Sequence, residues 1–190
     1  MVRKILSGEK TQTRRTFKQK ALEKIDSGVM SGKCFPLDHE KVKDDKHIKS
    51  YCPFGQIGSL LWVRETFASD LPTKSGYAYR ATHKPEDLKE DWQKTIKWTP
   101  SIHMPRSACR LILEITNIRY ERLGDITESD AKAEGCDDSQ PIGLVELSGN
   151  ENPLQRFQKL WSSVYGDKSW LNNQWTWVLD FKIHSIDNIN

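Results

Sequence analysis

Residues 175–183, near the end of the chain, alternate between two kinds of side chain. The inward positions are large and apolar: Trp175, Trp177, Leu179, Phe181 and Ile183. The outward positions include polar and charged residues: Thr176, Asp180 and Lys182. Because successive side chains of a strand point to opposite faces, this pattern predicts a strand with one apolar face turned to a core. A fold built on a β-sheet is therefore expected.

The other predicted elements are short, and strands and helices follow one another irregularly. A second long strand is predicted at 108–123, and shorter strands at 59–67 and 76–82. Helices are predicted at 2–6, 18–26, 85–96, 127–135 and from Pro153 to Gly166, and a long loop or insertion at 27–54. Without a βαβ rhythm, this order favours an α+β fold. We expect a single domain over residues 1–190, a compact mixed β-barrel with peripheral short helices.

Composition and cysteine spacing indicate the cellular compartment of the protein. Charged residues make up 29% and hydrophobic residues 36% of the 190 positions. No run of 18 apolar residues exists, so a membrane span is not expected, and the N-terminus lacks the apolar core of a signal peptide. The four cysteines are far apart in the sequence. They are expected to be reduced thiols in a cytoplasmic protein.

Positive charge is concentrated at the N-terminus. Residues 1–24 hold eight Lys or Arg against two Glu, a net charge of +6, while the whole chain carries only +3. A basic end on a nearly neutral body suggests an anionic partner such as a nucleic acid or a nucleotide. A solvated lysine-rich helix is the alternative.

The first candidate for chemistry is the segment Gly8-Glu9-Lys10-Thr11-Gln12-Thr13-Arg14-Arg15. If Thr13 begins a strand, Thr13 and Arg15 point to the same face. Lys10 would fold back over them from the preceding turn, bringing an amine, a hydroxyl and a guanidinium together. The alternative is a basic turn on the surface.

A carboxylate continues an apolar row in the predicted strand 59–67. Period-two alternation places Leu61, Val63 and Glu65 on one face. A carboxylate there is costly unless a cation or a hydrogen-bond donor meets it, and Lys10 is a natural partner. If the strand ends at Arg64 instead, Glu65 reaches solvent.

Two further segments carry polar groups. The loop Pro100-Ser101-Ile102-His103-Met104-Pro105-Arg106 is stiffened by two prolines, and loops of this kind position binding groups; a structural role for His103 remains an alternative. The spacing of Cys34, His39, His47 and Cys52 lacks the close cysteine pair of structural zinc sites, so no metal is expected. No fingerprint of ATP, dinucleotide or zinc-hydrolase sites is present, and no cofactor is expected.

The motif Gly8-x-Lys10-x-x-Thr13-x-Arg15 resembles the G-x-K-x-x-T-x-R signature of the ASCH superfamily, small β-barrel domains related to the PUA fold of RNA-modifying proteins. Further stretches resemble the larger phage- and prophage-associated branch in the same order: 52–55, 61–66, 100–106 and 170–181. The resemblance runs from residue 1 to about residue 182.

The resemblance implies an enzyme. One ASCH branch is similar to bacterial amidohydrolases that remove the acyl group from N4-acetylcytidine, and their Lys, Thr and Glu correspond to Lys10, Thr13 and Glu65. In one mechanism Thr13 is the nucleophile, Lys10 its base, and Glu65 orients Lys10 or moves the proton at the exocyclic nitrogen. In a variant, Thr13 stabilises the oxyanion and Glu65 activates water.

The expected partner is therefore a small modified cytosine nucleoside. The candidates for holding its base and sugar are Arg15, Tyr79, His103 and Arg106, with Tyr79 or Trp62 as a stacking platform. Two other functions stay open. One is an RNA-binding module whose phosphate contacts are Lys10, Arg14, Arg15 and Arg64. The other is a ribonuclease with Lys10 and Glu65 as acid and base.

Overall fold

The structure is a computed structural model that describes residues 1–39, 46–71, 73, 75–83, 96–137 and 151–186. Contacts between residues divide the chain into two compact units. The first unit is built from Arg3–Ser59 and Glu114–Lys182. The second unit is built from Leu60–Leu113 and the end of the chain from Ile183 onward.

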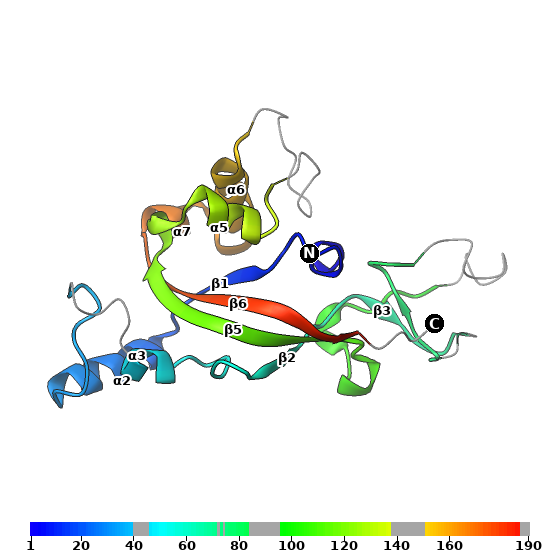
Figure 1. Ribbon diagram of the computed structural model, residues 1–190. Coiled ribbons are helices and arrows are strands. Elements are labelled where there is room, and N and C mark those ends of the chain that lie inside the picture. Colours follow the sequence, from blue (N-terminus) through cyan, green and yellow to red (C-terminus); the bar gives the residue numbers. More distant parts are fainter. Residues whose placement is uncertain (40–45, 72, 74, 84–95, 138–150, 187–190) are drawn as a thin grey trace. The chain divides into compact units, whose positions relative to one another are not determined.

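The main sheet has the strand order β1-β6-β5-β2 (Figure 1). Its strands are β1 (Gln12–Thr16), β6 (Trp175–Ile186), β5 (Leu111–Arg122) and β2 (Leu60–Trp62). β1 runs antiparallel to β6, with Thr13 opposite Leu179 and Arg14 opposite Val178. The predicted α+β class is confirmed. Within the described residues β1 and β2 are the two edges of an open sheet, so the predicted barrel is not closed there.

The predicted alternation in β6 is confirmed for one face only. Trp177, Leu179 and Phe181 are buried as expected, and Phe17 stacks on Trp177 with ring centroids 4.2 Å apart. Thr176, predicted to point outward, is fully buried as well. The reason is that helices of the first unit cover this second face, so neither face of the strand is simply exposed to water.

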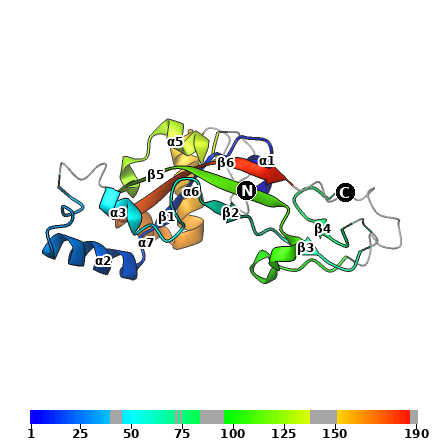
Figure 2. The same ribbon diagram turned by 60° about the horizontal axis from the view of Figure 1, so that its bottom comes forward.

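The helices that cover this face are α5 (Glu128–Ala133), α6 (Pro153–Tyr165) and α7 (Asp167–Leu171), which lie together beside the sheet (Figures 1 and 2). α5 begins with a capping box between Thr127 and Asp130, as its sequence predicts. α6 begins at Pro153, and Phe157 and Trp161 are buried in the core that α5 and α6 share. No helix of the described residues is long and apolar enough to cross a bilayer.

The remaining helices of the first unit are α1 (Val2–Leu6), α2 (Gln19–Met30) and α3 (Lys46–Ser50). The segment 27–54 is thus partly helical, and its residues 40–45 lie outside the described part of the chain. The predicted helix 85–96 lies almost wholly outside it too, since 84–95 are not described.

The predicted strand 59–67 is confirmed only over Leu60–Trp62, where β2 ends. A separate hairpin pairs β3 (Phe67–Ala68) with β4 (Ala78–Tyr79). The loop bounded by prolines forms two 3-10 turns, Ser101–His103 and Arg106–Ala108. Met104 between them is buried with Phe67 and Tyr79, and this small core fixes the loop.

Candidate functional site

Lys10 is brought to the C-terminal end of α5 by two tight turns. The chain leaves α1 through Gly8, whose φ of +80° is rarely adopted by residues with a Cβ. Lys10 then forms an isolated antiparallel bridge with Glu134. Gly135 follows with φ +85°, and a Cβ there would stand 3.3 Å from the Cβ of Lys10. Glycine at this position therefore permits the close approach.

Among the described residues, the ammonium of Lys10 is held by Glu134. Its Nζ lies 2.6 Å from Oε2 and 2.9 Å from the backbone oxygen of Glu134. The two residues are only 5% and 3% exposed. Opposite charges at this distance attract strongly where water is largely excluded. The pair fixes the Lys10 ammonium in one position.

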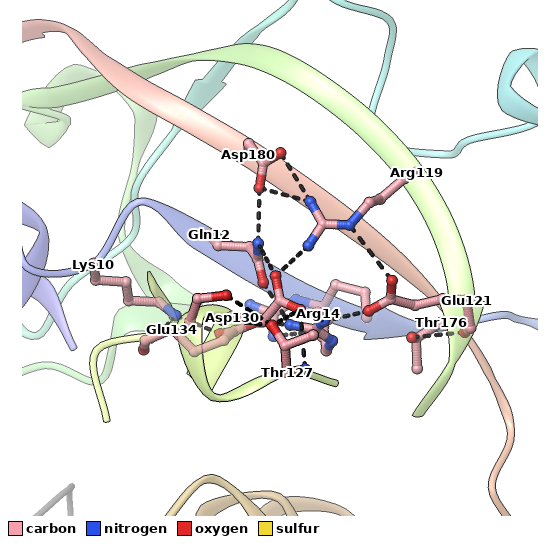
Figure 3. A network of polar contacts seen from close by, with 12 residues as sticks. Lys10, Gln12, Arg14, Arg119, Glu121, Thr127, Asp130, Glu134, Thr176 and Asp180 are labelled. Carbon is pink, nitrogen blue, oxygen red and sulfur yellow. Dashed lines mark hydrogen bonds and ion pairs between the residues drawn. The ribbon is translucent and has the colours of Figure 1, made fainter. Parts of the chain in front are cut away.

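Arg14 is the most buried charged residue of the segment, at 1% exposed. Its guanidinium pairs with Glu121 and lies 3.2 Å from Oδ2 of Asp130 and 3.9 Å from Oε1 of Glu134 (Figure 3). It also donates a hydrogen bond to the side-chain oxygen of Gln12. One cation thus connects β1 to β5 and to α5.

Asp130 joins the helix cap to this cluster. Burial alone would raise its pKa, but hydrogen bonds from Thr127 and Gln12, together with the charge of Arg14, outweigh burial and lower the pKa to about 2. The amide of Gln12 donates to Asp130 over 3.1 Å. Asp130 is therefore an ionised anchor at neutral pH.

Arg119 of β5 closes the cluster on its other side (Figure 3). It pairs with Asp130, lies 3.0 Å from Oδ2 of Asp180 and 3.5 Å from Oε2 of Glu121. Burial would lower the pKa of Arg119, but the three carboxylates raise it overall. Asp180, predicted to face outward, thus forms an ion pair within this cluster.

We call these residues the buried charge network: Lys10, Gln12, Arg14, Arg119, Glu121, Asp130, Glu134 and Asp180. It contains three cations and four carboxylates. Each of its charged side chains has an opposite charge within 4 Å. Such pairing holds three sheet strands, β1, β5 and β6, and the helix α5 in one arrangement. Removing one of its cations would leave a larger excess of carboxylates.

Thr13 and Arg15 lie on the other face of β1. Alternate residues of a strand share a face, and Gln12 and Arg14 point into the buried charge network. Thr13, half-buried, therefore points away from it, and so does Arg15, which is exposed. Their shared face is confirmed. The expected gathering of Lys10 over Thr13 is not, because Lys10 joins Arg14 on the α5 side instead.

Glu65 of the second unit is buried, as predicted, at 3% exposed. Its two oxygens accept hydrogen bonds from Nε and Nη2 of Arg110 over 2.8 and 2.9 Å. The same guanidinium lies 4.0 Å from the ring centroid of Tyr79. Tyr79 is buried and its hydroxyl donates to the backbone oxygen of Ala108, and burial raises its pKa to about 12. Tyr79 is therefore a core residue whose ring is covered by Arg110, an arrangement that does not favour its predicted role as a stacking platform.

Within their own units, Lys10 pairs with Glu134 and Glu65 pairs with Arg110. The pairing expected between Lys10 and Glu65 would join the two units and stays a prediction. Sequence analysis missed both partners. A signal for Glu134 was present, since it follows Asp130 by four residues and such positions share one helix face. Nothing in the sequence near Arg110 distinguishes it from other arginines of the chain.

His103 and Arg106 are exposed on the loop bounded by prolines. The guanidinium of Arg106 lies 6.0 Å from the ring centroid of Trp62, and that of Arg64 lies 4.6 Å from it. Arg64 also donates to the backbone oxygen of Ile102 over 3.3 Å. Two guanidiniums thus share one indole.

The residues considered for zinc have other contacts. The side chain of His47 is hydrogen-bonded to the hydroxyl of Tyr51 over 2.7 Å, and His39 stacks on Phe35. Burial raises the pKa of the Cys52 thiol. Among the described residues, no group of three or more His, Cys, Asp or Glu side chains is placed to hold a metal ion.

No protein-family model matches the chain. Comparisons with curated proteins and with solved structures find no match either. What the chain does must therefore follow from its own residues.

Proposed function

We propose that this chain is an ASCH-type amidohydrolase, with a PUA-like fold, that removes the acyl group from N4-acylated cytosine nucleosides such as N4-acetylcytidine. The supporting sequence feature is the signature Lys10, Thr13 and Arg15 together with Glu65. The observation that carries the proposal is the burial of two of the three charged residues in this set, Lys10 and Glu65. Burying a charge costs stability, which favours a function for charges kept at these positions.

The surroundings of Lys10 favour the mechanism in which water attacks the acyl carbon. Lys10 is paired with Glu134 and points away from Thr13, so it is badly suited to deprotonate that hydroxyl. Lys10 is therefore a positioning residue in this mechanism, because it holds the segment before β1 against Glu134. Thr13 donates a hydrogen bond from its hydroxyl to the developing oxyanion, and Arg15 on the same face holds the nucleoside.

Glu65 is the general base in this mechanism. A carboxylate offers about four lone-pair sites, and the two hydrogen bonds from Arg110 leave others for a water. Glu65 takes a proton as the water oxygen bonds to the acyl carbon. The bond from that carbon to N4 then breaks, and Glu65 returns the proton to N4. The products are cytidine and the free carboxylic acid.

The test is chromatography of N4-acetylcytidine incubated with the native chain and with Lys10→Met, Thr13→Val and Glu65→Gln. We expect the native chain to release cytidine and Thr13→Val to lose about 100-fold or more in kcat, as when one oxyanion donor is removed. Thr11→Val changes an exposed threonine of the same segment and should keep native activity. Substrate left intact by the native chain would overturn the proposal.

A second readout separates the two mechanisms. Mass spectrometry of the native chain quenched during turnover should show no acetyl group on Thr13 if water attacks directly. An acetylated Thr13 would instead establish the covalent route.

We also propose a cytoplasmic location. The four cysteines, all within the described residues, form no disulfide, which suits a reducing compartment.

A further inference from the structure

We propose that Trp62, Arg64 and Arg106 form a binding site for single-stranded nucleic acid on the second unit. The two guanidiniums would contact phosphates and the indole would stack on a base. The site includes none of Lys10, Thr13 and Glu65, so binding here can be measured apart from the proposed hydrolysis.

The charges of this site are uncompensated. Arg64 and Arg106 are exposed, and their guanidiniums lie 4.6 and 6.0 Å from the same indole centroid. Within the part of the chain that the structure describes, neither forms an ion pair with a carboxylate. Cations that share one ring repel each other. An anion that binds both relieves that repulsion.

Arg110 shows a different arrangement in the same unit. It is also stacked on an aromatic ring, that of Tyr79, but Glu65 holds it through two hydrogen bonds. That arginine is satisfied by the protein itself. Within the described ranges, Arg64 has one hydrogen bond, to the backbone oxygen of Ile102, which leaves most of its five donors without a protein acceptor there.

The loop that carries Arg106 is held rigidly below its exposed residues. Met104 and Ala108 are buried, and Ala108 accepts a hydrogen bond from the Tyr79 hydroxyl over 2.9 Å. Met104 also accepts one, through its sulfur, from the backbone of Glu65 over 3.2 Å. A loop fixed in this way loses little conformational freedom on binding, which favours affinity.

The combination of ring and charge identifies the class of ligand. Proteins bind single strands through cationic side chains along the backbone and aromatic rings under the bases. Trp62 offers an indole that is half-buried, with guanidiniums beside it. When Arg64 turns to a phosphate, the ring face that it covers becomes free for a base. An isolated phosphate would use the cations but not the ring.

The test is fluorescence anisotropy of a labelled 12-nucleotide single-stranded RNA titrated with the full chain at several salt concentrations. We expect log K to fall with log salt, and the slope to decrease by about one unit in each of Arg64→Ala and Arg106→Ala. Trp62→Ala should weaken binding about tenfold, and Trp62→Phe, which keeps an aromatic ring, should weaken it less.

Arg80→Ala is the matched control, because it removes an exposed arginine of the same unit that has no contact with Trp62 among the described residues. This variant should bind RNA nearly as the native chain does. Equal losses in Arg80→Ala and Arg64→Ala would overturn the site, since net charge alone would then explain binding. Absence of binding by the native chain would also overturn it. If cytidine monophosphate displaced the labelled RNA as well as an unlabelled oligonucleotide does, the preference for a strand would be refuted.

Discussion

The two units use arginine in opposite ways. In the first unit Arg14 is 1% exposed and lies among three carboxylates. Its ion pairs hold β1, β5 and α5 together. In the second unit Arg64 is exposed, rests on Trp62 and has no carboxylate partner among the described residues. Burial and pairing therefore separate arginines that maintain the fold from those able to contact a ligand.

This comparison reduces the number of residues available to the alternative function, an RNA-binding module. Of its four proposed phosphate contacts, Lys10 and Arg14 are buried and paired, which leaves Arg15 and Arg64 exposed. The net charge of the N-terminal segment therefore overestimates the number of cations there that can bind an anion.

The largest expected effect is the loss of Arg14. Arg14→Met would leave Glu121, Asp130 and Glu134 short of a cation in a buried place, and we expect the free energy of unfolding to fall by about 3–5 kcal/mol. Urea denaturation measures it. Arg15→Met, at the next and exposed position, should cost less than about 0.5 kcal/mol. Similar losses in both variants would contradict the assignment of Arg14 to the buried charge network.

The next effect concerns the pair in the second unit. Glu65→Leu leaves the Arg110 guanidinium uncompensated, and we expect a loss of about 3 kcal/mol in unfolding free energy. The double variant Glu65→Leu with Arg110→Leu should recover much of that loss, since neither charge then remains buried alone. Additive losses in this double-mutant cycle, followed by thermal or urea unfolding, would show that the two side chains do not depend on each other.

A smaller effect depends on pH. The pKa of Asp130 is lowered to about 2 in the folded chain, from 3.8 for a free carboxyl. Its contribution is therefore complete above about pH 4 and is lost as the pH falls toward 2, and it amounts to about 1–2 kcal/mol. Asp130→Asn should flatten the fall in unfolding free energy between pH 4 and 2. Glu128→Gln, exposed on the same helix, should leave that slope unchanged.

The smallest expected effect on stability is in the second unit's exposed site. Arg64→Ala removes one stacking contact with Trp62, which is worth at most about 1 kcal/mol at an exposed position. In Arg64→Ala and in Arg106→Ala, the free energy of unfolding should fall by no more than about 1 kcal/mol from the native value, while RNA binding weakens. A loss as large as that of Arg14→Met would assign these arginines to the fold and not to a ligand.

Local patterns predicted much of the fold. The capping box of Thr127 and Asp130, the start of α6 at Pro153 and the apolar positions of β6 follow from near neighbours in the sequence. The strand expected through Glu65 was wrong, because the chain leaves the sheet after Trp62 to form a separate hairpin. Periodicity alone does not detect where a strand ends when apolar residues continue beyond it.

The candidate site could be predicted only in part. The shared face of Thr13 and Arg15 followed from alternation. Glu65 is buried as expected, but not through strand alternation, since β2 ends at Trp62. The partners Glu134 and Arg110 could not be named, because each lies far along the chain, at positions 124 and 45 residues away from Lys10 and Glu65. Which opposite charges meet is decided by tertiary packing, and one sequence carries no direct record of it.

The most direct test of the proposed hydrolase is a time course of N4-acetylcytidine with the native chain, in which cytidine and acetate are quantified together. We expect equal amounts of the two products, formed at a rate proportional to protein concentration and greatly reduced in Thr13→Val but not in Thr11→Val. No cytidine above the level of a protein-free control, or the same rate in Thr13→Val as in the native chain, would contradict the assignment.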